Sequence, residues 1–176
     1  MNKNLDVVGY ALSGCTQDRL IFVVMENREV KVNEFYVLKH PLMEEKYVLT
    51  RVFRIQPYNP EMMTGRTGPL VGRKGKRAEY GRRLEYEIAY AEILGYYGER
   101  GKWRSMEVAS HPWDPIYRPD EKVLSEFLSG VEAKYQVFPV KIGKIRGMNI
   151  PVFVDLNSIA KGHMFVAGMT RSGKSR

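Results

Sequence analysis

The chain has 176 residues, of which 44% are hydrophobic and 27% charged. This composition is typical of a globular domain and excludes collagen-like and disordered chains. No apolar run reaches the roughly 18 residues that a membrane-spanning helix needs, and Met1 is not followed by the apolar segment of a signal peptide. We therefore expect no membrane partner and a cytoplasmic location.

Charge and cysteine content narrow the classes of partner and site. The net charge of +8 and the pI of about 9.5 favour polyanions such as nucleic acid. Cys15 is the only cysteine, which excludes an internal disulfide and a cysteine-based metal site. His40, His111 and His163 are far apart in the sequence, so no direct metal site is expected. Abundant Lys, Arg and Glu with little Gln favour a thermophilic source.

The first part of the chain is predicted to form strands. Short apolar runs rich in β-branched residues are too short for average helices and favour strands over residues 7–12, 20–25, 35–38 and 47–55. In the last of these, alternate positions place Tyr47, Leu49, Phe53 and Ile55 on one face, with Arg51 as the exception.

Residues 57–81 are predicted to form a long loop, because prolines and glycines punctuate this segment. Its end and the residues after it carry a basic cluster with a net charge of +5 over eleven residues, in which Glu79 is set against Arg73, Lys74, Lys76, Arg77, Arg82 and Arg83. These side chains are candidate phosphate contacts in a DNA channel. The alternative is a solvated loop.

Residues 84–97 give conflicting indications. Their Glu and Ala content favours a helix, whereas their apolar residues fall on alternate positions, as in a strand. We follow the period and predict a strand, then a hairpin loop over 98–101 and a strand over 103–109. For Trp103, Trp113 and the eleven tyrosines we expect packing in the core or an interface rather than a stacking surface.

The remaining elements include one clear helix. The three prolines of residues 111–119 predict an irregular segment. Asp120 can cap a helix that ends at Gly130. Two strands over 137–146 and 150–155 are expected around a turn at 147–149, and a buried strand over 164–167 leads into a glycine-rich loop.

That loop matches the P-loop pattern G-x-x-x-x-G-K-[ST] and consists of Gly168, Met169, Thr170, Arg171, Ser172, Gly173, Lys174 and Ser175. Its glycines allow a tight turn whose N–H groups converge on phosphate oxygens. Lys174 would contact the β- and γ-phosphates of ATP, and Ser175 would be a ligand of Mg²⁺. The motif follows a predicted buried strand, as it does in P-loop proteins.

The sequence ends one residue after the motif, at Arg176. A P-loop NTPase also needs further strands, an acidic metal ligand and a residue that positions the attacking water. We therefore expect a truncated nucleotide-binding domain. ATP and Mg²⁺ would be cofactors of the full-length parent, and no catalytic residue, bound cofactor or ATP hydrolysis is expected of the 176-residue chain alone.

The region around the motif resembles the HerA family of archaeal and bacterial DNA translocases. The resemblance rests on residues 151–159 and on 161–170, where a segment with His163 precedes the strand and the loop. Residues 91–96 and 111–119 resemble the family's N-terminal HAS barrel, a small β-barrel shared with rotary ATP synthases. One departure is Arg171, where the family usually has glycine.

The resemblance implies a hexameric ATP-dependent helicase or translocase that acts on double-stranded DNA in end resection and repair, together with a NurA-type nuclease. The barrel would serve ring assembly and contact with DNA or the nuclease. The alternatives from other classes are a stand-alone basic β-barrel that binds nucleic acid, and a P-loop ATPase with a non-DNA substrate. Dependence of DNA binding on residues 73–83 would favour the stand-alone barrel.

The expected fold is mainly β. A HAS-type barrel of about six strands with one or two short helices would occupy residues 1–156. The first strand and P-loop of a truncated α/β RecA-like ATPase domain would occupy residues 157–176.

Overall fold

The computed structural model of the chain describes residues 5–60, 85–98, 102–129, 138–145 and 149–161. It divides the chain into two compact units, Met1–Asp120 and Glu121–Arg176. The predicted strand over 164–167, the P-loop over 168–175 and the basic cluster over 73–83 lie outside the described residues. The expected ATPase domain after residue 156 therefore stays a prediction. Within the described ranges, no helix is long and apolar enough to cross a membrane.

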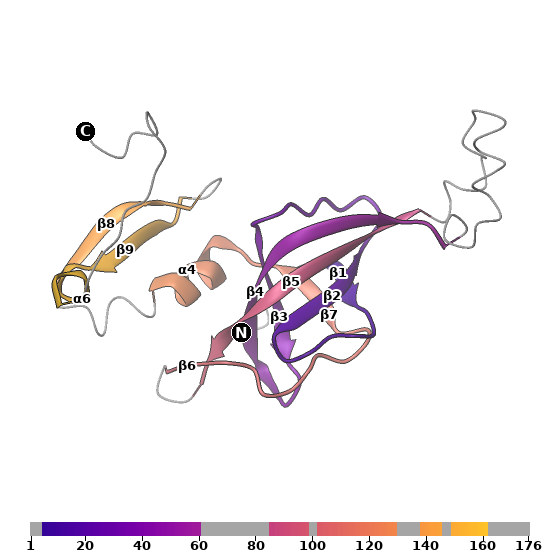
Figure 1. Cartoon of the computed structure of the whole chain (residues 1–176), viewed down its shortest axis with the longest axis horizontal. Helices are drawn as coiled ribbons and strands as arrows, with labels where there is room; N and C mark the ends of the chain where they lie inside the picture. Colours follow the sequence, from indigo (N-terminus) through magenta and orange to yellow (C-terminus); the bar gives the residue numbers. More distant parts are fainter. Residues whose placement is uncertain (1–4, 61–84, 99–101, 130–137, 146–148, 162–176) are drawn as a thin grey trace. The chain divides into compact units, whose positions relative to one another are not determined.

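The first unit is a closed antiparallel β-barrel (Figure 1). Its strands are β1 (Asp6–Ala11), β2 (Arg19–Val24), β3 (Phe35–His40), β4 (Met43–Tyr58), β5 (Tyr86–Tyr97), β6 (Trp103–Arg104) and β7 (Pro115–Arg118). They are hydrogen-bonded in the order β2-β1-β7-β3-β4-β5, and pairing of β5 with β2 closes the six strands. The short strand β6 pairs with the end of β5. The predicted six-stranded barrel is thus confirmed.

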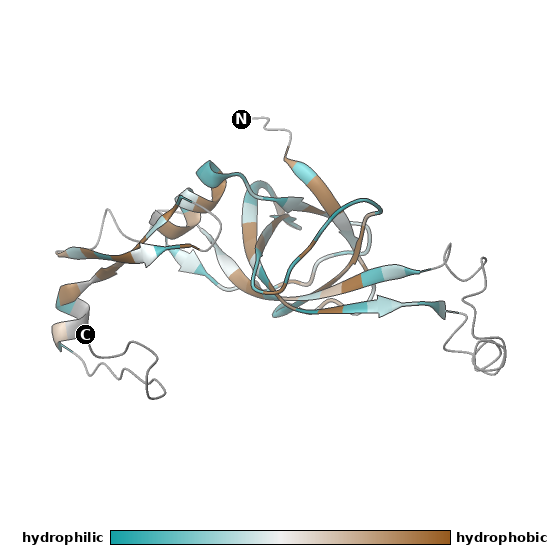
Figure 2. Cartoon of the chain, turned by 90° about the horizontal axis from the view of Figure 1, so that it is seen from above, coloured by the Kyte–Doolittle hydropathy of each residue, from teal (hydrophilic) through white to brown (hydrophobic). Residues whose placement is uncertain are grey.

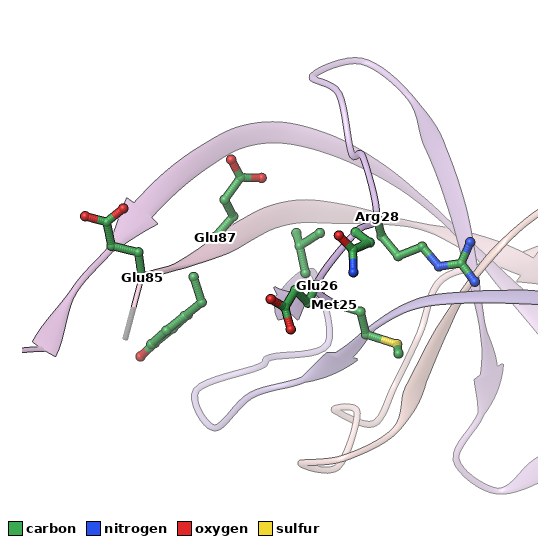
Figure 3. Close-up of a pocket in the computed structure, with 8 residues that line it drawn as sticks. Met25, Glu26, Arg28, Glu85 and Glu87 are labelled. Atoms are coloured by element: carbon green, nitrogen blue, oxygen red, sulfur yellow. The ribbon is translucent and has the colours of Figure 1, made fainter. Parts of the chain in front are cut away.

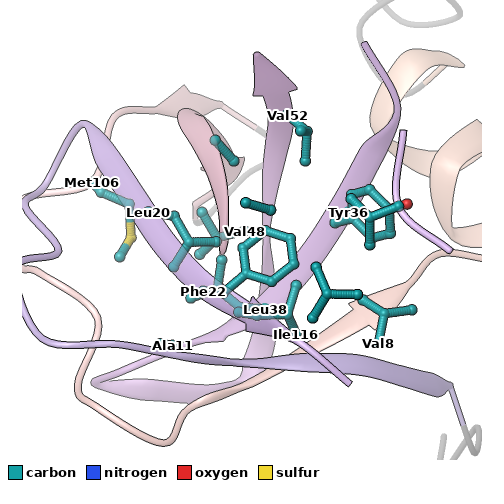
Figure 4. Packing of buried hydrophobic residues seen from close by; sticks show 14 of the residues in the cluster. Val8, Ala11, Leu20, Phe22, Tyr36, Leu38, Val48, Val52, Met106 and Ile116 are labelled. Carbon is teal, nitrogen blue, oxygen red and sulfur yellow. The ribbon is translucent and has the colours of Figure 1, made fainter. Parts of the chain in front are cut away.

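Alternating side chains form the barrel core. Phe22, Tyr36, Leu38, Val48 and Ile116 are fully buried in one cluster, which Figure 4 shows from close by. Figure 2 shows the alternation as changes between hydrophobic and hydrophilic residues along the barrel strands. This pattern is expected when one face of each strand packs inside the barrel and the other faces outward.

Strand β5 resolves the conflict between propensity and period in favour of the period. Ala89 pairs with Phe22 and Ala91 with Leu20, and all four side chains are buried. The small alanines leave room for the large side chains of β2 inside the barrel, so these residues serve packing rather than a helix.

The proline-rich segment 111–119 contains a strand, which corrects the prediction that it is irregular. Strand β7 lies between β1 and β3, with Ile116 pointing into the core. Its prolines do not interrupt the ladder, because Pro115 is the first residue of the strand and Pro119 follows its end. The predicted strand over 103–109 is also wrong in extent, since only Trp103–Arg104 pair with β5.

Strand β4 extends further than predicted, so the long loop does not begin at Pro57. Pro57 pairs with Glu87, and Tyr58 pairs with Tyr86. Strand β3 pairs with β4 only as far as Arg51. Among the described residues, the end of β4 beyond Val52 therefore pairs on one side only, with β5, and proline is tolerated at such an edge.

The second unit contains α4 (Glu121–Ser129), β8 (Pro139–Lys144), β9 (Pro151–Asp155) and α6 (Leu156–Lys161). The predicted helix and the predicted hairpin of two antiparallel strands are confirmed. On α4 the predicted apolar positions Val123, Leu124 and Phe127 are buried. The backbone N–H of Asn149 donates a hydrogen bond of 3.3 Å to Glu121 Oε1, which connects the hairpin to the start of the helix.

Candidate functional site

The outer surface of β2, β5 and β4 carries aromatic and arginine side chains together. We call it the aromatic–arginine face and define it by Arg19, Arg51, Phe53, Arg54, Tyr58, Tyr86, Tyr90 and Glu92. Register places it on the outside. Val52 opposite Ala91 and Ile55 opposite Ala89 pack toward the core, so the pairs that alternate with them, such as Arg54 opposite Tyr90, face outward.

A β-bulge shapes the centre of this face. The register between β4 and β5 shifts between Val52 and Arg54, and Phe53 is the extra residue. A bulge leaves the extra residue unpaired, while the segments on both sides of it remain paired with the neighbouring strand. The Phe53 side chain is 45% exposed, and its ring centroid lies 6.5 Å from that of Tyr90. The bulge therefore adds a second aromatic ring next to Tyr90.

The arginines are held against these rings and against one carboxylate. The Arg54 guanidinium lies 5.5 Å from the centre of the Tyr90 ring and donates a 3.1 Å hydrogen bond to Gln56 Oε1. Arg51 forms an ion pair of 2.6 Å with Glu92, whose other register neighbour is Arg19 on β2. Two arginines thus lie beside the Glu92 carboxylate and a third lies over Tyr90, so the residues that define the face have a net positive charge.

A second aromatic pair lies further along the same two strands. Strand β2 pairs with β5 only as far as Ile88, so Tyr58 and Tyr86 belong to a two-stranded extension of β4 and β5 (Figure 1). Their ring centroids are 5.1 Å apart, and Tyr86 is 37% exposed. Planar rings and guanidinium groups that alternate along a β-ribbon can stack on flat ligands and contact anions.

A recess with acidic walls opens next to this extension. It has a volume of about 450 Å³ and is lined at its charged positions by Glu26, Arg28, Glu85 and Glu87 (Figure 3). Arg28 points away from the three glutamates and forms an ion pair of 2.7 Å with Asp6. Across the described ranges, no three His, Cys, Asp or Glu side chains are arranged to hold a metal ion.

The residues that the sequence singled out for function are not placed by the structure. The P-loop residues, Lys174 and Ser175 among them, lie outside the described residues, and so does the basic cluster. The basic cluster belongs to the stretch of chain that joins β4 to β5, the two strands that carry most of the aromatic–arginine face. The face itself was missed, because the aromatic residues were assigned to packing.

Cys15 is a structural thiol in this barrel. Its single S–H can donate to the carbonyl oxygen of Leu12 (3.2 Å), and its Sγ accepts a hydrogen bond from the backbone N–H of Ile21 (3.4 Å). Burial raises the pKa of the thiol, and this effect outweighs the lowering by the backbone hydrogen bond with Ile21. The thiolate, which is the reactive form, is therefore disfavoured.

His40 is buried and titrates differently in the folded and unfolded chain. Its Nδ1 accepts a 3.1 Å hydrogen bond from the backbone N–H of Leu42, and its ring packs edge-on against Tyr96 with centroids 4.6 Å apart. Burial lowers the pKa of His40 below its usual value of 6.5, and the negative charge of Glu107 opposes this shift. Between pH 6.5 and the lowered pKa, the unfolded chain therefore binds a proton that the folded chain does not.

We expect the free energy of unfolding to be highest above pH 6.5 and to fall as the pH drops through the lowered pKa of His40. The loss is about 1.4 kcal/mol for each unit of difference between the two pKa values. In His40→Asn, whose side-chain oxygen can replace Nδ1 as acceptor, this part of the loss should disappear. Urea unfolding between about pH 8 and pH 5 measures it. His111→Asn, at an exposed histidine, is the control. An unchanged pH profile in His40→Asn would contradict this assignment.

Comparisons with known proteins give no family for this chain. No protein-family model matches it. It is similar to an uncharacterized protein of Aquifex aeolicus (strain VF5), with 26% identity over an alignment that spans 97% of this chain and 70% of that protein. The similarity extends across both units, but the name of that protein states no activity.

Proposed function

We propose that this chain is the N-terminal part of a hexameric, ATP-dependent DNA translocase of the HerA type, acting in DNA end resection and repair. The observation that carries the proposal is that one polypeptide combines a β-barrel with a P-loop motif. A closed six-stranded antiparallel barrel of residues 1–120 is followed by a second unit whose sequence contains a complete P-loop motif. The resemblance to HerA predicts this order of barrel and P-loop.

The P-loop supplies the chemical part of the proposal. In a folded nucleotide-binding domain, the backbone N–H groups of residues 168–173 would surround the phosphates of ATP. Lys174 would neutralise charge on the β- and γ-phosphates, and Ser175 would bind Mg²⁺. Motif matches of this kind are specific when a buried strand precedes them, as the sequence predicts here.

The barrel supplies the assembly and contact part. We propose that it organises a ring of six copies and offers surfaces to double-stranded DNA and to a NurA-type nuclease. Two observations support a DNA contact. The chain carries a net charge of +8, and the basic cluster belongs to the segment that joins β4 to β5. Lysine and arginine contacts to phosphates supply most of the affinity in sequence-independent DNA binding.

The proposal is tested by ATP turnover of the full-length gene product with and without duplex DNA. We expect DNA-stimulated hydrolysis in the wild type. In Lys174→Ala we expect a loss of at least about 100-fold, because one preorganised contact to the transferred phosphate is removed. Lys161→Ala, a lysine at the end of α6 outside the motif, is the matched control and should retain turnover.

Two outcomes would contradict the proposal. Hydrolysis that survives Lys174→Ala unchanged would show that the P-loop motif is not the nucleotide site. Hydrolysis that depends on Lys174 but ignores duplex DNA would favour a P-loop ATPase with another substrate.

A further inference from the structure

We propose that the aromatic–arginine face of the barrel binds single-stranded nucleic acid. In this proposal, bases stack on the rings of Phe53 and Tyr90, and phosphates contact the neighbouring arginines. The inference concerns a surface of the first unit alone. It uses neither the P-loop nor the basic cluster, and it holds whether or not the chain belongs to a motor.

The first argument is the exposure of large rings on an outer barrel surface. Phe53 and Tyr86 are 45% and 37% exposed, and both lie in ring pairs rather than singly. Paired exposed rings leave apolar area in water that a flat ligand can cover. Proteins that bind single strands without sequence preference use aromatic side chains in this way, because every base has a π-face.

The second argument is charge complementarity. Around Phe53 and Tyr90 the three arginines of the face, Arg19, Arg51 and Arg54, outnumber the single carboxylate of Glu92. The glutamates of the recess lie at the Tyr86 end of the face, and the whole chain is basic. Arg54 lies over the Tyr90 ring and contacts Gln56, so its guanidinium is pre-positioned beside the aromatic platform. A guanidinium next to a stacking ring presents N–H donors to a phosphate while the adjacent base stacks.

The third argument selects a single strand over a duplex. Tyr90 and Tyr86 are four residues apart on β5, which separates the two ring pairs by about 13 Å along the strand. A flexible single strand can place unstacked bases on both pairs. In a duplex the base faces are stacked on one another, and side chains reach only the base edges and the phosphates. Exposed rings therefore add affinity mainly for unpaired bases.

The same residue types also occur in protein interfaces, where tyrosine and arginine are common anchors. The net positive charge of the face favours a polyanion over a neutral or basic protein surface, including a second copy of this basic chain. Evidence that a protein binds this face instead would overturn the proposal.

The experiment measures fluorescence anisotropy of a labelled oligothymidylate and of a blunt duplex of equal length, with the whole chain and without nucleotide. We expect Tyr90→Leu, which keeps apolar volume but removes the ring, to weaken single-strand binding on the order of ten-fold. Tyr90→Phe keeps the ring and should bind like the wild type. Circular dichroism and thermal unfolding confirm that each variant is folded.

Two matched controls lie elsewhere on the barrel. Trp113→Leu removes a ring that is 80% exposed and packs against Tyr10 of β1, two strands away from β5 in the barrel order. Lys39→Gln removes one positive charge from β3. Both should bind as the wild type does, whereas Arg54→Gln should reduce the salt dependence of single-strand binding by about 0.7 in the logarithmic slope. The basic cluster is present in every variant, so its contribution cancels in the comparison.

Several outcomes would overturn the proposal. Equal affinities of Tyr90→Leu and the wild type for the single strand would show that the ring takes no part. A parallel loss of duplex binding would show that the variant acts through general electrostatics or folding. A change in oligomeric state with unchanged affinity would identify a protein interface. Because the assay contains no ATP, its result is independent of the test of the translocase proposal.

Discussion

Phe22→Ala is expected to lower the free energy of unfolding of the barrel by about 3–5 kcal/mol, because it removes a large side chain from a filled core. The Phe22 ring is fully buried, and its centroid lies 6.1 Å from that of Tyr36. It faces Ala11 on β1 and Ala89 on β5, where two small side chains leave the space that the ring occupies. Neither alanine can fill the resulting cavity, since both are held in register by two strands.

The measurement is urea unfolding followed by tryptophan fluorescence. Both tryptophans of the chain, Trp103 and Trp113, lie in the first unit, so the signal reports the barrel alone. Phe53→Ala is the matched control, because this phenylalanine lies in the same barrel but is 45% exposed. Its cost should stay below about 1 kcal/mol. Similar costs for both variants would mean that the core does not close around Phe22.

Strands β1 to β5 of the barrel were predictable from short apolar runs and from period two. Strand β5 is the clearest case, because its Glu and Ala content favours a helix while the structure follows the alternation. A period assigns residues to two faces, however, and does not say which face is inside. In β5 the small residues Ala89 and Ala91 face the core, and the larger Tyr90 faces outward.

Bulges explain why the face of β4 was assigned incorrectly from the sequence. Alternate positions grouped Phe53 with Ile55, but the register shift between Val52 and Arg54 separates them. Ile55 packs against the core, whereas Phe53 is exposed. A single inserted residue exchanges the two faces beyond it. The aromatic–arginine face depends on this shift, so sequence alternation alone could not have found it.

Strand β7 was missed because the number of prolines in a segment does not show whether they lie inside a strand or at its ends. Three prolines in residues 111–119 favour a loop, yet one of them begins and another follows a four-residue strand that the barrel needs between β1 and β3. The requirement comes from closure, which is a property of the whole sheet. The P-loop, in contrast to β7, is recognisable from local sequence. Its local chemistry is readable from eight residues, and its function remains a proposal.

Gly95→Ala is expected to destabilise the barrel by at least about 2 kcal/mol, for two independent reasons. Gly95 has a φ of +136°, a conformation that residues with a Cβ rarely adopt. A Cβ at this position would also lie 2.5 Å from the carbonyl oxygen of Arg104 and 2.9 Å from the Trp103 ring. The carbonyl belongs to the backbone of β6, so it cannot rotate away as a side chain would.

Gly143→Ala separates these causes from the general effect of replacing glycine in a strand. Gly143 lies in β8, and a Cβ there would meet nothing within 4 Å. Because β8 belongs to the second unit, which contains no tryptophan, the effect of Gly143→Ala is measured by circular dichroism of the whole chain. It should stay within about 0.5 kcal/mol. Gly95→Ala should also change the fluorescence of Trp103, which packs against Tyr97 with ring centroids 5.1 Å apart, even under conditions where the variant is folded. If Gly95→Ala is as stable as the wild type and leaves Trp103 fluorescence unchanged, β6 is not seated on β5 at Gly95. The barrel would then close without β6, because the six-strand circuit ends with the pairing of β5 and β2.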